Sequence, residues 1–207
     1  MYVPPAYAET RPGILRAAIE AASFGTLVTR GAHRLHLTHL PFTVEGGESD
    51  LRLVGHVARS NPQGSDLAEG SEAVASFVLD HAYVSPSWYP SKAEHGRAVP
   101  TWNYVAVEAR GEARFTTDPD ALRGMVGALT GRHEGARPDP WTLTDAPGPY
   151  VRKLLAAITG VTLHVRELTG AWKLGQGKGR ADHEGVTAGL RAEGALGVAA
   201  LMDAARR

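Results

Sequence analysis

The segment from Gly55 to Gln63, Gly-His-Val-Ala-Arg-Ser-Asn-Pro-Gln, combines residue types that bind anions. Its apolar start predicts a strand that ends at Val57, and Ser60 and Asn61 ahead of a proline predict a helix that begins near Ser60. Free N–H groups and the helix dipole favour an anion at such a point. Arg59 adds a forked guanidinium that suits phosphate, and Ser60 adds a hydroxyl. These residues suit an anion such as phosphate; the alternative, which stays open at this point, is that Ser60 and Asn61 only cap the helix while Arg59 is solvated.

Two neighbouring segments, 81–92 and 99–104, are dense in aromatic and proline residues. They hold two of the four Trp and three of the six Tyr of the chain. Because large aromatic side chains are costly to expose, we expect them to cover something. The candidates are a planar ligand such as a flavin ring, or a partner subunit. The remaining alternative is a loop that packs back on its own barrel.

Two other patterns, a histidine series and a Gly-rich segment, resemble functional sites but do not predict a metal site or a phosphate loop. His33, His36 and His39 are spaced by three, but on the predicted strand His36 points opposite to the other two. With no Cys and no HExxH sequence, we expect no metal site, although a haem needs only one axial His and stays open. Segment 175–180, Gly-Gln-Gly-Lys-Gly-Arg, matches neither common phosphate-loop pattern and predicts a flexible basic loop.

The elements that must position these segments are mostly strands. Alternating and β-branched runs joined by short turns predict six or so antiparallel strands, over 25–29, 34–40, 51–57, 72–79, 105–115 and 161–168. Capping residues and apolar stripes predict helices over 10–22, 118–131 and 149–157. A weak helical tail is expected over about 182–207, because its four glycines each cost about 1 kcal/mol against Ala. The predicted fold class is mainly β with peripheral helices (α+β), a small antiparallel barrel in a single domain over 1–207.

Composition narrows the function classes. A length of 207 residues fits one domain, and the absence of Cys excludes disulfides and thiolate chemistry. Lys and Arg number 22, as do Asp and Glu, so the formal net charge is +0. DNA stays open as a partner, but this net charge does not support it. No apolar run approaches the roughly 20 residues of a membrane span, and the start does not look like a signal peptide, so we expect a cytoplasmic protein without membrane contact.

As a set, the motifs closely resemble the PaiB family of FMN-binding negative transcriptional regulators. The resemblance is carried, in order, by Met-Tyr-Val-Pro-Pro at 1–5, the Gly55–Gln63 segment, His-Ala-Tyr-Val-Ser-Pro-Ser-Trp-Tyr at 81–89, Val-Pro-Thr-Trp-Asn-Tyr at 99–104 and Trp-Lys-Leu at 172–174. It implies an FMN-binding split β-barrel akin to pyridoxamine phosphate oxidases, as a homodimer with the flavin in a cleft between subunits. A regulator or flavin-linked sensor is the implied function; a flavin-dependent oxidoreductase is the alternative, and a haem-binding protein on the same barrel is the second alternative.

The resemblance also implies a set of cofactor-binding residues, whereas catalytic residues stay unassigned. The residues expected at the FMN phosphate are Arg59, Ser60 and Asn61, and those expected at the ribityl chain or ring edge are Thr26 and Thr29. The residues expected along the ring are Tyr83, Ser85, Trp88 and Lys92. The residues expected to complete the cleft, in part from the second subunit, are Trp102, Asn103, Tyr104 and Lys173.

The aromatic load predicts a homodimer with the aromatic segment near the interface, because interfaces favour Trp and Tyr. Light scattering at micromolar concentration should report twice the chain mass of 22.0 kDa. A monomer at that concentration would remove the cleft between subunits.

Overall fold

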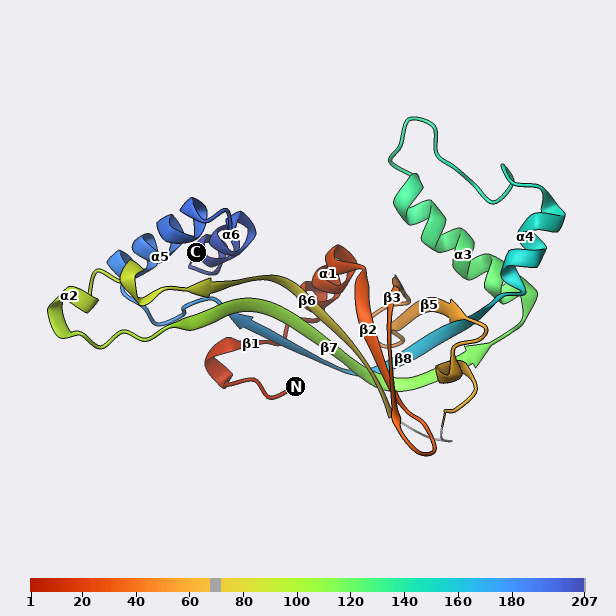
Figure 1. The fold of residues 1–207 in the computed structure, drawn as a ribbon, viewed down its shortest axis with the longest axis horizontal. Helices are drawn as coiled ribbons and strands as arrows, with labels where there is room; N and C mark the ends of the chain where they lie inside the picture. Colours follow the sequence, from red (N-terminus) through yellow and green to blue (C-terminus); the bar gives the residue numbers. More distant parts are fainter. Residues whose placement is uncertain (68–71, 207) are drawn as a thin grey trace. The chain divides into compact units, whose positions relative to one another are not determined.

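The computed structural model describes residues 1–67 and 72–206, and these form an antiparallel sheet with helices around it (Figure 1). The predicted class, mainly β with peripheral helices, is confirmed, but the described residues form eight strands rather than six or so. The strands are β1 Ala8–Glu9, β2 Phe24–Arg30, β3 Leu35–Pro41, β4 Thr43–Glu45, β5 Arg52–Ala58, β6 Glu72–Val84, β7 Thr101–Thr116 and β8 Ile158–Lys173. Their order is β3-β2-β6-β7-β8-β5-β4, and β1 pairs with β8.

Short helical turns and helices connect the strands. The 3₁₀ turns are η1 Pro5–Tyr7, η2 Pro62–Gly64 and η3 Pro86–Trp88. The α-helices are α1 Pro12–Ala22, α2 Lys92–His95, α3 Pro119–Glu134, α4 Gly148–Leu155, α5 Arg180–Ala192 and α6 Leu196–Ala205. None of the helices among the described residues is long and apolar enough to cross a membrane.

The chain divides into two compact units. The first comprises 1–11, 78–107 and 169–207, and the second comprises 12–77 and 108–168. The three longest strands, β6, β7 and β8, each contribute residues to both units. Each unit is therefore built around segments that are far apart in the sequence, and the single domain over 1–207 stays a prediction.

The second unit contains the β2–β3 hairpin and the pairing of β5 with β8. Alternation along β2 buries Leu27 and Thr29 on one face, as expected for a strand with one face in a core. The sequence correctly placed the start of α3, where Asp118 accepts a hydrogen bond from the Ala121 N–H at 2.8 Å. The helix continues to Glu134, beyond the predicted end at Gly131, since one glycine lowers helix stability without ending a helix.

A small core fixes α3 and α4 in this unit. Leu122 of α3 packs with Val151 and Leu155 of α4, and all three are buried. The apolar stripe of α4 is satisfied by this contact, which leaves its polar face, including Arg152, exposed.

The first unit has its core between the strands and the last two helices. Val84 and Val105 pack with Val186 and Leu190 of α5 and with residues of α6, and Figure 1 shows α5 and α6 side by side. The tail is thus a pair of packed helices rather than the weak helix expected from its glycines. Tertiary packing overrides helix propensity here. Arg207, the last residue of the predicted tail, lies outside the described residues.

Glycine is required at position 111 of β7, where the strand lies close to the backbone of β8. A Cβ at Gly111 would lie 1.8 Å from the carbonyl oxygen of His164, which no side-chain rotation can relieve. A Cβ at Gly124, inside α3, would meet nothing within 4 Å. The two positions provide a matched pair of tests.

We predict that Gly111→Ala lowers the free energy of unfolding by about 2–3 kcal/mol, because the two strands must separate locally. Gly124→Ala should raise it by up to about 1 kcal/mol, because Ala favours the helix. Urea unfolding of both variants checks this. Equal stability of Gly111→Ala and the parent protein would contradict the close approach.

Candidate functional site

Arg59 follows β5 directly and is anchored to the start of β8. Its N–H donates to the Ala157 carbonyl at 2.8 Å, and its Nε donates to the Ile158 carbonyl at 2.9 Å. No carboxylate of residues 1–67 or 72–206 forms an ion pair with it. The two terminal guanidinium nitrogens of the exposed Arg59 have the geometry that an anion needs, and its role at a phosphate stays a prediction.

The expected helix N-terminus after Arg59 is wrong. The segment forms only the three-residue 3₁₀ turn η2, which has too few aligned peptides for a helix dipole. Asn61 caps this turn: its Oδ1 accepts from the Gln63 N–H at 3.0 Å, and its Nδ2 donates to the Thr38 hydroxyl at 2.8 Å. For Asn61 the structure therefore agrees with the alternative of a capping residue. Ser60 is exposed, and it stays a candidate only through its position next to Arg59.

A cavity of about 220 Å³ opens beside Arg59 within the same unit. Its other wall residues are Thr117, Pro119, Leu122, Arg152, Leu155 and Ala156. The wall is largely apolar, with one guanidinium from the end of β5 and a second from α4. Sequence analysis missed Arg152, because nothing in its local pattern distinguishes it from any basic residue near the end of a helix.

Thr26 and Thr29 do not lie together. They point to opposite faces of β2, since residues three apart on a strand alternate. Thr29 is 1% exposed, and its hydroxyl accepts from the buried amide of Gln63 at 3.1 Å. Thr26 is partly exposed and is hydrogen-bonded to Nδ1 of His39 at 2.8 Å. The structure gives Thr29 a role in the core and leaves Thr26 available on the outer face.

An exposed aromatic cluster, His81, Tyr83 and Trp102, lies on β6 and β7 in the first unit. The rings of His81 and Trp102 are 5.9 Å apart, and those of Tyr83 and Trp102 are 6.2 Å apart. Tyr83 is 44% exposed and Trp102 is 48% exposed, so a large part of each side chain stays open to water. Trp102 Nε1 also donates to Nδ1 of His81 at 3.3 Å. His81 lies in a motif that carried the resemblance, but it was not chosen as a site residue.

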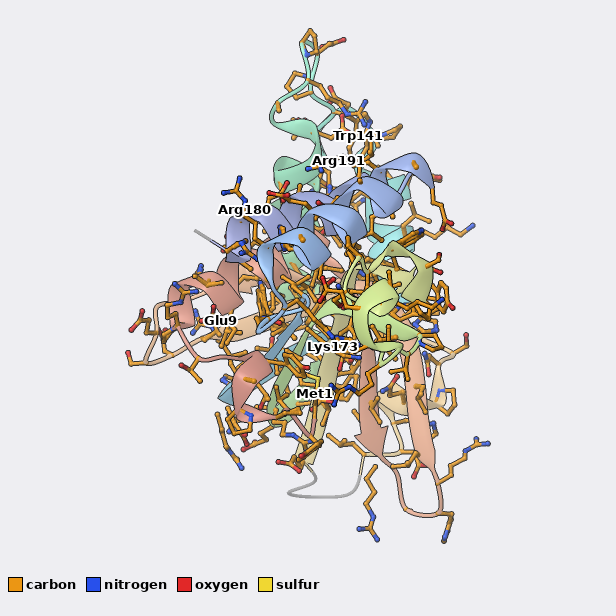
Figure 2. All side chains as sticks on the ribbon, turned by 90° about the vertical axis from the view of Figure 1, so that its left-hand side faces the viewer. Met1, Glu9, Trp141, Lys173, Arg180 and Arg191 are labelled. Carbon is orange, nitrogen blue, oxygen red and sulfur yellow. The ribbon has the colours of Figure 1, made fainter. Side chains whose placement is uncertain are left out.

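The neighbours of this cluster on the strands have different environments. Asn103 points inward, is 2% exposed and donates to the sulfur of Met202 at 3.3 Å. Tyr104 is partly exposed. Lys173, labelled in Figure 2, is the last residue of β8 and donates to the Thr101 hydroxyl at 2.7 Å. Asn103 therefore belongs to the core. Lys173, by contrast, places its ammonium group at Thr101, the residue before Trp102.

The other predicted ring residues lie around η3 and α2. Ser85 accepts from the Ser87 N–H at 3.3 Å and caps η3. Trp88 covers α5, where a Cβ at Gly189 would lie 2.3 Å from its ring. Lys92 begins α2 and is exposed. Trp88 therefore packs on its own chain, as the alternative has it.

Asp182 of α5 ties this segment to the C-terminal helices. Its carboxylate accepts from the Ser91 N–H at 3.1 Å and from the Ser91 hydroxyl at 2.8 Å. These hydrogen bonds hold the pKa of Asp182 below its usual value. Lys178, from the predicted basic loop, lies 4.9 Å above the centre of the Tyr89 ring. Arg180 at the start of α5, labelled in Figure 2, pairs with Glu184 at 2.7 Å and takes no part in the contacts between Asp182 and Ser91.

The predicted site residues thus divide between the two units. Thr26, Thr29 and residues 59–61 belong to the second unit, and the remaining candidates belong to the first. Within the second unit the guanidinium of Arg59 suits a phosphate group, and within the first the exposed rings suit a planar ligand or another protein surface.

Sequence comparison identifies the family. The family model described as "Putative FMN-binding domain" matches residues 1–167. Protease synthase and sporulation protein PAI 2 of Bacillus subtilis is 30% identical over 194 residues, which cover 93% of this chain and 90% of the relative. An uncharacterised protein of Aspergillus fumigatus is 31% identical over 248 residues, which cover 96% of this chain and 95% of the relative. The chain belongs to this FMN-binding domain family, and the resemblance to PaiB is confirmed.

Solved structures show the same fold. The FAD and heme binding protein from Mycobacterium smegmatis aligns with a TM-score of 0.58 at 21% identity, covering 88% of this chain and 80% of that chain. The flavocytochrome Anf3 from Azotobacter vinelandii aligns with a TM-score of 0.59 at 15% identity, covering 86% of this chain and 75% of that chain. The predicted split-barrel fold class is confirmed, with FMN as the cofactor of the family.

The hydrogen bonds from Ser91 to Asp182 predict a pH dependence of stability. Because its pKa is lowered in the folded protein, the stabilisation is present above the usual Asp pKa of about 4 and is lost as pH falls through the lower folded value. Asp182→Asn should therefore melt below the parent protein at pH 7, and the difference should shrink toward pH 3. Melting curves of Asp182→Asn and of the exposed control Glu193→Gln check this; a difference that does not change with pH would contradict it.

Proposed function

We propose that this chain is an FMN-binding regulatory protein of the PaiB type, which works in the cytoplasm as a homodimer and uses the bound flavin as a sensor. The observation that carries the flavin part is the anchored guanidinium of Arg59, which has no carboxylate partner among the described residues and borders a cavity. A phosphate dianion is the part of FMN that such a group recognises. When bound, FMN would supply redox chemistry and a colour change. The protein residues supply phosphate binding at Arg59.

The regulatory part is supported by the relative and by charge. The Bacillus subtilis relative carries protease synthesis and sporulation in its name, and this chain has a formal net charge of +0. Because a net charge of zero gives no general attraction to the DNA backbone, the proposed regulation acts through protein contacts rather than through DNA binding by this chain alone.

The exposed aromatic cluster is the proposed subunit contact. Tyr83 and Trp102 are each more than two-fifths exposed, and interfaces are enriched in these residue types. A second copy would remove the rings from water. The ring-side roles of Ser85, Lys92, Tyr104 and Lys173 remain part of this proposal.

The test is a comparison of two flavins. The parent protein should bind FMN more tightly than riboflavin, which lacks the phosphate. Arg59→Ala should weaken FMN by roughly tenfold to a hundredfold, because each charge-assisted hydrogen bond contributes about 1.5–3 kcal/mol. Riboflavin binding should be nearly unchanged, and the exposed control Arg34→Ala should leave both affinities unchanged. Flavin fluorescence titration gives all of these values.

Equal losses for FMN and riboflavin in Arg59→Ala would show that Arg59 does not hold the phosphate. A Soret band in the purified protein would favour the haem-binding alternative. Steady oxidation of a nicotinamide cofactor by the FMN-loaded protein would favour the oxidoreductase alternative over a sensor.

A further inference from the structure

We propose that Arg152 is a second phosphate-binding residue and that the cavity between Arg59 and Arg152 takes a phosphomonoester dianion. This inference rests on the proposed FMN binding for the identity of the ligand, because the FMN phosphate is the phosphomonoester it names. It adds a residue from α4 that neither the sequence motifs nor the family match singles out, since residues 1–167 match as a whole.

The first observation is the pairing of arginines. Carboxylates lie within 3.9 Å of many guanidinium groups in this protein, namely those of Arg11, Arg16, Arg52, Arg110, Arg114, Arg137, Arg166, Arg180 and Arg191. Within the part of the chain that the structure describes, Arg59 and Arg152 have no such partner, a state that they share with Arg30, Arg34, Arg97, Arg123, Arg132 and Arg206. Yet the two line the same cavity of about 220 Å³. Two cations that face one space without a counter-charge favour a dianion there.

The second observation is how firmly Arg59 and the helix that carries Arg152 are positioned. Arg59 is fixed to Ala157 and Ile158 by its N–H and its Nε, and these residues lie two and three positions after the end of α4. α4 is fixed in turn by Val151 and Leu155, which are buried against Leu122 of α3. The end of β5 and the end of α4 are therefore held next to each other before any ligand binds, which lowers the entropy that binding must overcome.

The third observation is the chemistry of the walls. Leu122, Leu155 and Ala156 contribute apolar surface, and Thr117 contributes a hydroxyl. Apolar walls limit the competition of water and strengthen charge-assisted hydrogen bonds. They also suit a phosphate that carries an organic chain. A forked guanidinium on each side can donate hydrogen bonds to the phosphate oxygens, and no proton is transferred on binding.

An alternative role for Arg152 is to stabilise the C-terminal end of α4. It lies in the last turn of α4 together with Lys153, and a cation there interacts favourably with the helix dipole. Lys153 is exposed and does not line the cavity, so it is the matched control: Lys153→Gln and Arg152→Gln remove the same charge from the same turn. Only Arg152→Gln removes a cavity cation.

The experiment measures FMN and riboflavin affinities of the parent, Arg152→Gln, Arg152→Lys and Lys153→Gln proteins by fluorescence titration. We expect Arg152→Gln to weaken FMN about tenfold, which is 1.4 kcal/mol, and to leave riboflavin within about twofold. Arg152→Lys keeps the charge but loses the forked geometry, so its FMN affinity should lie between those of the parent and Arg152→Gln. Lys153→Gln should change neither. Equal effects of Arg152→Gln and Lys153→Gln, or equal losses of both flavins, would overturn the inference.

A second readout separates this inference from the proposed function. Inorganic phosphate, compared with chloride at equal ionic strength, should raise the melting temperature of the parent and of Lys153→Gln more than that of Arg152→Gln. If the parent binds neither flavin but shows this effect, the FMN proposal fails and the anion site stands. If the parent prefers FMN to riboflavin and neither readout depends on Arg152, the inference fails and the FMN proposal stands.

Discussion

The antiparallel pairing of β5 with β8 is the constraint on which the proposed phosphate site depends. The register runs from Arg52 opposite His164 to Ala58 opposite Ile158, so β5 ends where β8 begins. The residue after β5 is Arg59, and only Ala156 and Ala157 separate the end of α4 from the start of β8. A slip of one residue would turn every side chain of β5 to the other face and would carry Arg59 away from its carbonyl partners. The site is thus a consequence of sheet register, and no helix dipole is needed.

Local patterns predicted most of the fold. Alternation along the segments that became β2, β3, β5 and β7 fixed their strand character, and Asp118 followed by Pro119 identified the start of α3. The motif residues led to the correct family because their order along the chain is specific. Strand number was underestimated because β1 and β4 are two and three residues long, which leaves too little periodicity to detect.

What the sequence could not predict depends on contacts between distant segments. The glycines of the tail looked like helix breakers, but Gly189 lies under the Trp88 ring and makes room for it. Asn61 and Thr29 were expected at the ligand, but both accept hydrogen bonds from Gln63, and the amide of Asn61 donates to Thr38. Arg152 lies 93 residues after Arg59 in the chain, so only the folded structure shows that they share a cavity.

The central claim is that guanidinium groups bind the FMN phosphate as a dianion, and phosphorus NMR tests it most directly. The phosphate of free FMN should titrate near pH 6, as phosphomonoesters do. The account predicts that the phosphorus signal of protein-bound FMN keeps its dianion position from pH 8 down to about pH 5, because the guanidinium groups favour the charged form. A bound signal that titrates near pH 6, as free FMN does, would contradict the account.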